Sequence, residues 1–277
     1  MGNPHGIQQM GAAQSADRQF RGDTCVDQEP EGFLVGRDVH ARGWRICVSF
    51  KTQMSTKIIA GLIDHTLLKQ DTKQAEIIQL CEEAMKYNFA SVCIPPYYVR
   101  EASNALEFQK GNVKVSTVVG FPLGYSSVLA KVEEIKKAIH EGADEIDAVL
   151  NICAIKNEDW SFVRNEIDSL VLGTHMKGKV IKLILETSML THSEIEKVCA
   201  IALDFKPNFL KTSSGFSGGA TLDTVQTMFS VVGKNINIKA SGGIRDLSTL
   251  IQFKELGVKR IGTSAGVSIM EELSRLS

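Results

Sequence analysis

A short apolar run followed by an amphipathic helix recurs along this chain from Ile58 to the C-terminus. The first unit is the run 58–64 with a helical apolar stripe over 77–85, and the last is the run 260–266 with a terminal helix. About eight such units fit into about 220 residues, which is the count and length of a closed (β/α)8 barrel. We therefore predict an α/β fold, a (β/α)8 TIM barrel.

An open, doubly wound sheet is the other architecture that alternating strands and helices build. It usually has fewer strands, and no GxGxxG sequence follows the first run of this chain. In a closed barrel, the chemistry is found where the C-terminal ends of the strands meet. The polar residues at or near such ends are Asp64, Cys93, Asp147, Glu186, Lys211, Lys239 and Ser264.

Residues 1–53 differ from the repeating part of the chain. Glycine, glutamine and charged residues dominate there, so the segment buries too little apolar surface to offset the entropy of ordering. We expect a disordered extension over 1–53 and one (β/α)8 domain over 54–277. Acidic residues in the extension, among them Asp17, Asp23 and Glu29, argue against an organelle transit peptide.

The composition excludes several classes of partner. The formal net charge is -1 and the pI is about 6.6, so no field favours nucleic acid or an anionic membrane surface. The six cysteines include no CxxC pair and no Cys/His cluster at metal-ligand spacing. No window approaches the roughly 18 apolar residues of a membrane helix. We expect a cytoplasmic protein that binds neither nucleic acid nor a membrane.

Three lysines interrupt apolar runs that otherwise resemble buried strands: Lys182, Lys211 and Lys239. Strands of a parallel sheet are covered on both faces, so they consist almost entirely of Val, Ile and Leu. An ammonium group leaves water only when something offsets its desolvation. Any one lysine could lie at a strand end and reach solvent along its flexible stem. Three together indicate a shared cavity.

Lys211 and Lys239 would lie on the sixth and seventh strands, which are neighbours in such a barrel. Two ammonium groups about 4 Å apart repel by about 4 kcal/mol at an effective dielectric constant near 20, or roughly three pKa units. One amine can therefore be neutral near pH 7 and attack a carbonyl group. This indicates imine chemistry. The alternative is that both lysines only bind an anion such as phosphate.

Two glycine-containing segments follow the seventh and eighth strands, Ser241–Arg245 and Gly262–Gly266. Small residues there let backbone N–H groups approach an anion, and loops at this position bind phosphate in many barrels. Glycine pairs also form ordinary turns, so both interpretations stay open on these segments alone.

Asp147 is the one carboxylate in the apolar stretch 146–150. A carboxylate beside ammonium groups in a dry cavity can transfer protons. It can equally form a structural ion pair with a lysine. The sequence Asp64-His65-Thr66 suggests a hydrogen-bonded hub at a strand end, with a structural rather than a catalytic His65.

Eight short motifs follow one another, one for each strand. They are Ile63–Leu68, Ser91–Ile94, Val119–Gly124, Glu145–Asp147, Leu185–Thr187, Lys211–Phe216, Lys239–Arg245 and Gly262–Ser264. Together they resemble the deoxyribose-phosphate aldolase family, from about Lys57 to the C-terminus. The resemblance implies a class I aldolase that reversibly cleaves 2-deoxy-D-ribose 5-phosphate to D-glyceraldehyde 3-phosphate and acetaldehyde, without a metal or other cofactor.

The resemblance also implies roles for individual residues. Lys211 would form the Schiff base, Lys239 would lower the pKa of Lys211 and join proton transfer, and Asp147 would donate and accept protons. The positions that match the family's pocket are Asp64, Cys93 and Lys182. Those that match its phosphate contacts are Gly215, Gly242, Gly243 and Ser264. A dimeric or tetrameric homo-oligomer is expected.

The chain departs from the family pattern in its loops. The segment Gly215–Thr221 is one residue shorter, Pro95 stands where many members have Asn, and Ala265 where many have a second Ser. These departures concern phosphate affinity and loop geometry. The competing interpretations are another phosphate-sugar barrel, transaldolase-like or an epimerase, and a barrel that binds sugar phosphate without turnover.

Overall fold

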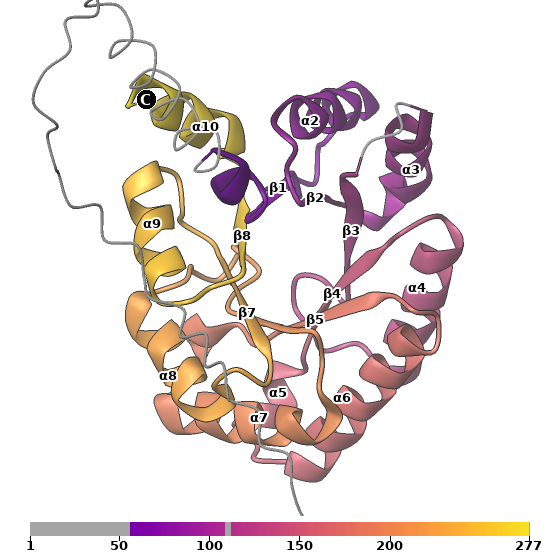
Figure 1. Cartoon of the computed structure of the whole chain (residues 1–277). Coiled ribbons are helices and arrows are strands. Elements are labelled where there is room, and N and C mark those ends of the chain that lie inside the picture. The colour runs from indigo at the N-terminus through magenta and orange to yellow at the C-terminus, as the bar shows by residue number, and fades with distance from the viewer. Residues whose placement is uncertain (1–55, 109–111, 277) are drawn as a thin grey trace, which may run out of the picture. The chain divides into compact units, whose positions relative to one another are not determined.

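The strands of this protein form a closed parallel barrel. The computed structural model describes residues 56–108 and 112–276, so the predicted extension over 1–53 lies outside the described residues. The strands are β1 (Ile63–Thr66), β2 (Ser91–Ile94), β3 (Lys114–Val119), β4 (Glu145–Val149), β5 (Val180–Ile184), β6 (Phe209–Lys211), β7 (Asn237–Ser241) and β8 (Arg260–Thr263). They lie in chain order, and β1 pairs with both β2 and β8, which closes the sheet (Figure 1). The predicted (β/α)8 barrel is confirmed.

Helices form a ring outside the barrel (Figure 1). They are α2 (Gln74–Tyr87), η1 (Pro96–Tyr98), α3 (Val99–Phe108), α4 (Val128–His140), α5 (Ile152–Lys156), α6 (Trp160–His175), η2 (Thr187–Met189), α7 (His192–Phe205), α8 (Leu222–Val232), α9 (Leu247–Glu255) and α10 (Gly266–Arg275). The sequence predicts Ser193 or Thr191 as the N-cap of α7 and Asp246 as the N-cap of α9; Thr191 and Asp246 are the N-caps in the structure. The Thr191 hydroxyl accepts from Glu194 N at the start of α7, and Asp246 accepts from Thr249 N at the start of α9.

The apolar core lies between the barrel strands and the helices. Successive side chains of a strand point to opposite faces of the sheet. In β4, Ile146 and Ala148 belong to this core, whereas Asp147 between them points into the barrel, where it meets lysines of other strands. Every residue of β4 is buried, so a charged side chain on its inner face must find partners inside the barrel.

Two strand predictions are wrong in their bounds. The run 58–64 is not one strand, because residues 56–60 are helical and β1 begins only at Ile63. Apolar periodicity does not separate a short buried helix from a strand. Glu186 is not part of β5, which ends at Ile184; Glu186 lies in the following turn with a φ of 56°.

Two smaller features of the helices differ from what the sequence predicts. Asp71 or Thr72, just before the apolar stripe over 77–85, is the predicted N-cap of α2, but the N-cap is Lys73, and the Thr72 hydroxyl donates to Lys69 O. A single helix from about 158 to 176 is predicted after the fourth strand, but the short helix α5 precedes it. Its N-cap is Asn151, whose side chain accepts a hydrogen bond from Ala154 N. The apolar sequence of this short helix did not indicate the cap.

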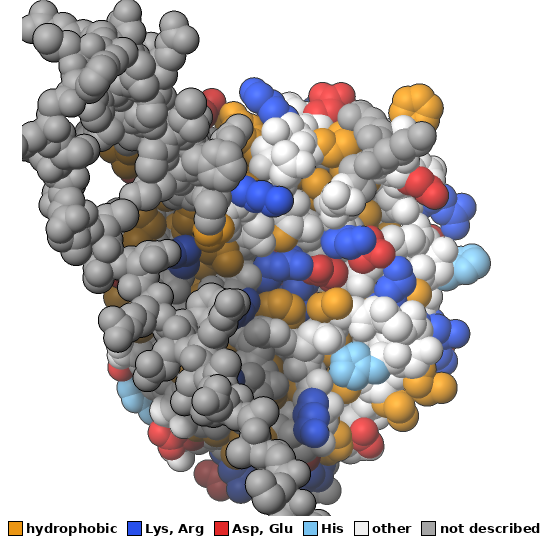
Figure 2. All heavy atoms as spheres, viewed as in Figure 1, with side chains coloured by type: hydrophobic (Ala, Val, Ile, Leu, Met, Phe, Trp, Pro, Cys, Tyr) orange, Lys and Arg blue, Asp and Glu red, His pale blue; other side chains and the backbone are white. Residues whose placement is uncertain are grey.

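One face of the molecule and its helices bear on possible partners. No helix in the described residues is long and apolar enough to cross a membrane. On the face seen in Figure 2, positively and negatively charged side chains lie interspersed, with no extended area of one sign.

Candidate active site

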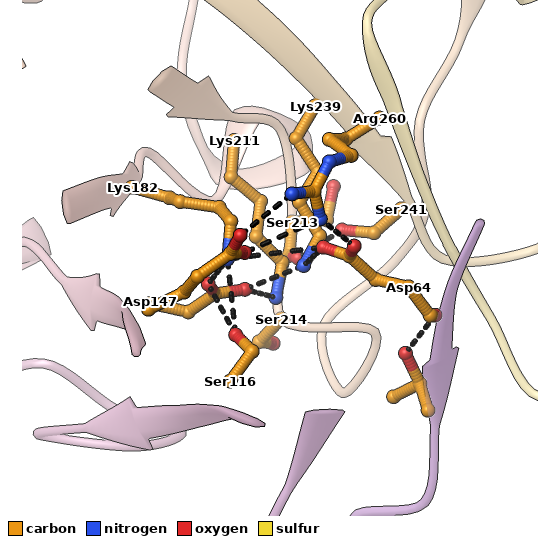
Figure 3. Close-up of polar contacts among 12 residues, drawn as sticks. Asp64, Ser116, Asp147, Lys182, Lys211, Ser213, Ser214, Lys239, Ser241 and Arg260 are labelled. Atoms are coloured by element: carbon orange, nitrogen blue, oxygen red, sulfur yellow. Dashed lines mark hydrogen bonds and ion pairs between the residues drawn. The ribbon is translucent and has the colours of Figure 1, made fainter. Parts of the chain in front are cut away.

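Seven charged side chains from six strands converge inside the barrel (Figure 3). They are Asp64 of β1, Glu145 and Asp147 of β4, Lys182 of β5, Lys211 of β6, Lys239 of β7 and Arg260 of β8. We call this set the charged cluster. Each residue except Arg260 is at most 4% exposed. The convergence follows from the closed barrel, since inward-pointing side chains of all strands share one interior.

Asp147 lies at the centre of the charged cluster. Its Oδ1 accepts from Lys182 Nζ at 2.6 Å, and its Oδ2 accepts from Lys211 Nζ at 2.9 Å and from Lys239 Nζ at 2.7 Å. Ser116 of β3 adds a hydroxyl donor at 3.1 Å. Burial alone would raise the pKa of this carboxyl, but the three ammonium groups hold the pKa well below its usual range. Asp147 is therefore a carboxylate at neutral pH.

Lys211 and Lys239 face each other across adjacent strands. They are register partners on β6 and β7, and both amines donate to the same oxygen of Asp147. Lys239 Nζ also contacts Asp64 Oδ2 at 2.5 Å, so Lys239 has two carboxylate partners whereas Lys211 has one. Burial would lower the pKa of Lys239, but Asp147 and Asp64 raise it above its ordinary value. Lys239 is therefore protonated at neutral pH.

Lys182 has partners of its own in the charged cluster. Its Nζ lies 2.6 Å from Asp147 Oδ1, 2.7 Å from Glu145 Oε2 and 3.0 Å from Ser116 Oγ. Burial would lower the pKa of Lys182, yet Asp147 and the neighbouring carboxylates raise it. Lys182 is thus a second lysine that keeps its positive charge at neutral pH.

Two members of the charged cluster were not among the predicted site residues, Glu145 and Arg260. The Arg260 guanidinium binds Glu145 with N–O distances of 2.6 and 3.2 Å and also donates to Asp64 Oδ1. Arg260 lies 196 positions after Asp64 in the sequence. Only closure of the barrel joins these residues, so no local pattern could have identified the pair.

The cluster as a whole carries an uneven charge. When every group is ionised, four cations face three carboxylates: Lys182, Lys211, Lys239 and Arg260 against Asp64, Glu145 and Asp147. A buried net charge is costly in a medium of low dielectric constant. Loss of one lysine proton would balance the cluster.

A cavity of about 280 Å³ opens above the cluster, and Lys211 is the one of its lysines that lines it. The four predicted phosphate contacts line the same cavity: Gly215, Gly242, Gly243 and Ser264. The backbone N–H groups of these four residues donate no hydrogen bond to any described residue. Among the described residues, several backbone N–H groups of the cavity lining therefore have no hydrogen-bond partner, and Lys211 lines the same cavity.

Backbone packing shapes the loops around this cavity. Gly242 has a φ of 86°, and a Cβ there would lie 2.8 Å from both Gly218 O and Gly219 Cα. The loop after β7 can pack this closely against the loop after β6 because Gly242 has no side chain. Ala220 N, which donates to Ser241 O at 3.0 Å and Gly242 O at 3.2 Å, fixes the contact.

The other predicted pocket residues lie in different surroundings. Asp64 and Lys182 belong to the charged cluster and do not line the cavity. Cys93 of β2 is fully buried beside the cluster, and burial raises the pKa of its thiol. Pro95 lines a neighbouring hollow of about 360 Å³ that shares Phe216 with the cavity, so this departure from the family pattern lies outside the group of free backbone donors.

A closed barrel with a buried lysine cluster and an anion-sized cavity at its mouth defines the class of an aldolase-type (β/α)8 enzyme. The chain belongs to the DeoC/LacD family of aldolases, whose sequence profile matches residues 58–271.

Similar proteins carry a more specific name. Deoxyribose-phosphate aldolase of Shouchella clausii is 49% identical over 213 residues, which cover 76% of this chain and 94% of that protein. The enzyme of the same name from Thermococcus gammatolerans is 45% identical over 214 residues, 77% of this chain and 95% of the relative. The solved structure of tetrameric deoxyribose phosphate aldolase from Aeropyrum pernix has 27% identity and a TM-score of 0.74, and covers 88% of this chain and 100% of that one.

Proposed function

We propose that this protein is a deoxyribose-phosphate aldolase that reversibly cleaves 2-deoxy-D-ribose 5-phosphate to D-glyceraldehyde 3-phosphate and acetaldehyde. The observation that carries the proposal is the position of Lys211, which lines the anion-sized cavity while sharing Asp147 Oδ2 with Lys239. Relatives with this name at 45% and 49% identity support the choice of substrate.

Lys211 is the nucleophile in this proposal because its proton is the easiest one to lose. The charged cluster has one cation in excess, and Lys182 and Lys239 each have at least two carboxylate neighbours within 4 Å. Lys211 has one such neighbour in the described part of the chain, and that oxygen is shared. Removal of the Lys211 proton leaves an uncharged amine exposed to the cavity.

The reaction would begin with attack of the Lys211 amine on the C1 aldehyde of the open-chain sugar. The carbinolamine takes up a proton and loses water, which gives a protonated imine. The C3 hydroxyl then loses its proton, the C2–C3 bond breaks, and its electron pair moves into the imine, leaving an enamine on Lys211. Glyceraldehyde 3-phosphate departs. Protonation of the enamine at its carbon and hydrolysis of the imine release acetaldehyde and regenerate the amine.

Asp147 and Lys239 would transfer the protons of these steps. Asp147 Oδ2 lies 2.9 Å from Lys211 Nζ and 2.7 Å from Lys239 Nζ. Asp147 can therefore accept a proton from Lys211, and Lys239 can donate a proton in return. The fixed charge of Lys239 also opposes protonation of Lys211. Both residues act within hydrogen-bond distance of the reacting nitrogen or of each other.

The substrate phosphate would bind at the free backbone N–H groups of Gly215, Gly242, Gly243 and Ser264. Backbone donors grouped at loop tips and near a helix N-terminus bind anions well, and Ser264 precedes α10 by two residues. With the phosphate held there and C1 at Lys211, the cavity would fix both ends of the sugar.

Assembly and location complete the proposal. We infer a homo-oligomer, a dimer or tetramer, because the similar Aeropyrum pernix aldolase is tetrameric. A cytoplasmic location fits the substrate, a phosphorylated intermediate of deoxynucleoside breakdown.

The test is a direct assay of C–C cleavage. The purified chain is incubated with 2-deoxy-D-ribose 5-phosphate, and acetaldehyde and glyceraldehyde 3-phosphate are measured separately by coupled reduction and oxidation. We expect equimolar formation of both products, and loss of both in Lys211→Ala. Phosphorylated product without acetaldehyde would indicate a transaldolase-like or epimerase reaction instead.

A further inference from the structure

We propose that Arg260 is a positioning residue for the aldolase reaction: it supplies the surplus positive charge of the charged cluster and so leaves the Lys211 amine free to attack. This inference rests on the proposed function and extends it to a residue that does not line the cavity. Arg260 would act through Asp64 and Glu145, without contact with substrate.

The contacts of Arg260 fix its guanidinium inside the barrel. It binds Glu145 through both terminal nitrogens, donates to Asp64 Oδ1, and stacks over the Phe209 ring at 5.8 Å from the centroid. Its side chain is 14% exposed. An arginine stays protonated at any working pH, so this position holds a charge that cannot be lost.

Asp64 links this charge to the reacting centre. Its Oδ1 accepts from Arg260, and its Oδ2 lies 2.5 Å from Lys239 Nζ, which in turn contacts the Asp147 oxygen that binds Lys211. Arg260 and Lys239 are also register partners on β8 and β7. The guanidinium is therefore two carboxylates and one ammonium group away from the nucleophile.

Charge counting gives the consequence. With Arg260, four cations face three carboxylates, and one lysine must lose its proton for the cluster to be neutral. Without it, three lysines match three carboxylates, so every lysine is better stabilised as an ammonium ion. Removal of a nearby positive charge raises the pKa of an amine. We therefore expect Arg260→Gln to be less active than wild type at neutral pH.

Other titratable groups near the barrel interior are not members of the charged cluster. The groups that face Lys211 and Arg260 from the surrounding strands are Asp64, Cys93, Glu145, Asp147, Lys182 and Lys239. The Cys93 thiol is neutral because burial raises its pKa. His65 bonds Glu83 at 2.8 Å, away from the cluster, and the Glu186 carboxylate accepts from Ser214 N.

The first test compares the pH dependence of kcat/KM in wild type, Arg260→Gln and Arg260→Lys. We expect the acidic limb of the Arg260→Gln profile to move up by about one pH unit or more, so that activity lost at pH 7 returns at alkaline pH. Arg260→Lys keeps the charge and should keep the wild-type limb. Activity that falls equally at all pH values in Arg260→Gln would overturn the proposal.

The second test is the double variant Arg260→Gln/Glu145→Gln. It removes one charge of each sign, which restores one surplus cation, and so the acidic limb should return toward its wild-type position. A merely structural role for Arg260 predicts no such return, because the double variant lacks both partners of the ion pair. A limb that stays shifted would contradict the charge count.

Imine formation separates this inference from the proposed function. Wild type is treated with acetaldehyde and borohydride at several pH values. The extent of lysine modification should fall at low pH over the same pH range as kcat/KM. If wild type cleaves no deoxyribose 5-phosphate and traps no imine, the proposed function fails. If wild type is active but Arg260→Gln traps the imine with an unshifted pH dependence, only the role of Arg260 fails.

Discussion

Lys211 and Lys239 donate to one and the same carboxylate oxygen, Asp147 Oδ2, from 2.9 and 2.7 Å. The two nitrogens are therefore separated by no more than the sum of these distances. At such a separation the two charges oppose each other strongly, even at the effective dielectric constant of a protein interior. Lys239 has a second carboxylate neighbour, Asp64, which Lys211 lacks among the described residues.

Asp147→Asn removes the charge that holds the three lysines together. We expect kcat to fall by about two orders of magnitude or more, since the amide cannot accept a proton. Stability should fall by about 3–5 kcal/mol, because ammonium groups remain buried without a carboxylate. Steady-state kinetics and urea unfolding measure the two effects.

Asp144→Asn is the matched control for this substitution. Asp144 also pairs with a lysine, Lys179, at 2.9 Å, but both side chains are partly exposed, at 35% and 28%. An exposed ion pair contributes at most about 1 kcal/mol. Wild-type kcat in Asp144→Asn and a large loss in Asp147→Asn would locate the effect in the barrel interior; equal losses would contradict it.

Because of the charged cluster, the free energy of unfolding should fall both at low pH and at high pH. The pKa values of Asp147 and Asp64 are lowered in the folded state, so their contribution is present above the ordinary carboxyl value of about 3.9 and is lost as pH falls through the folded pKa. The pKa of Lys239 is raised, so its contribution is complete below about pH 10.4 and is lost at higher pH.

Unfolding free energies from urea titrations between about pH 2 and pH 11 test this expectation. Wild type should lose stability below about pH 4 more steeply than Asp147→Asn, which lacks one of the two depressed carboxyls. Parallel acidic limbs in the two proteins would show that Asp147 does not stabilise the fold through its charge.

Gly242→Ala tests the packing of the phosphate loops. Its Cβ would lie 2.8 Å from backbone atoms of the loop after β6, so the two loops must separate. We expect KM for deoxyribose 5-phosphate to rise by about an order of magnitude, since misplaced backbone donors lose charge-assisted hydrogen bonds. Cleavage of unphosphorylated 2-deoxyribose should change far less.

Gly178→Ala controls for backbone strain. Gly178 also has a positive φ, 65°, but a Cβ there would meet no atom within 4 Å. It should destabilise by about 1–2 kcal/mol without raising KM. If both glycine variants change KM alike, the close approach at Gly242 does not shape the phosphate site.

Lys131 of α4 was not predicted as a buried residue, yet it is fully buried. Its Nζ contacts Glu166 Oε1 at 2.6 Å and Val149 O at 2.7 Å, and also donates to Gly124 O. Lys131→Met should cost about 3–5 kcal/mol, because Glu166 would be buried without its cation. Adding Glu166→Gln should recover part of that loss in urea unfolding, whereas the exposed Lys136→Met should change stability by less than about 1 kcal/mol.

The sequence predicted the barrel because strand and helix periodicities are local properties. It also predicted that Lys182, Lys211, Lys239 and Asp147 lie together. A charged side chain in a buried apolar strand needs charged partners, and the barrel interior is where such partners can meet. The glycine-containing turns after β7 and β8 were recognisable because glycine pairs mark turns locally, but the packing of Gly242 against the loop after β6 depends on distant residues.

The remaining features depend on contacts between distant residues. Arg260 begins β8 and Glu145 begins β4, positions at which a charge ordinarily reaches solvent. The inclination of the strands in the closed barrel brings the two together across the interior. Lys131 was hidden likewise, because its polar partners are backbone oxygens and a glutamate of another helix.

The most direct test of the account is the site of imine formation. Wild-type protein is incubated with acetaldehyde, reduced with borohydride, digested, and mapped by mass spectrometry. We expect one added ethyl group on Lys211, absent when borohydride or acetaldehyde is omitted and absent in Lys211→Ala. An ethyl group on Lys239 in place of Lys211, or no lysine adduct in a protein that still cleaves deoxyribose 5-phosphate, would contradict it.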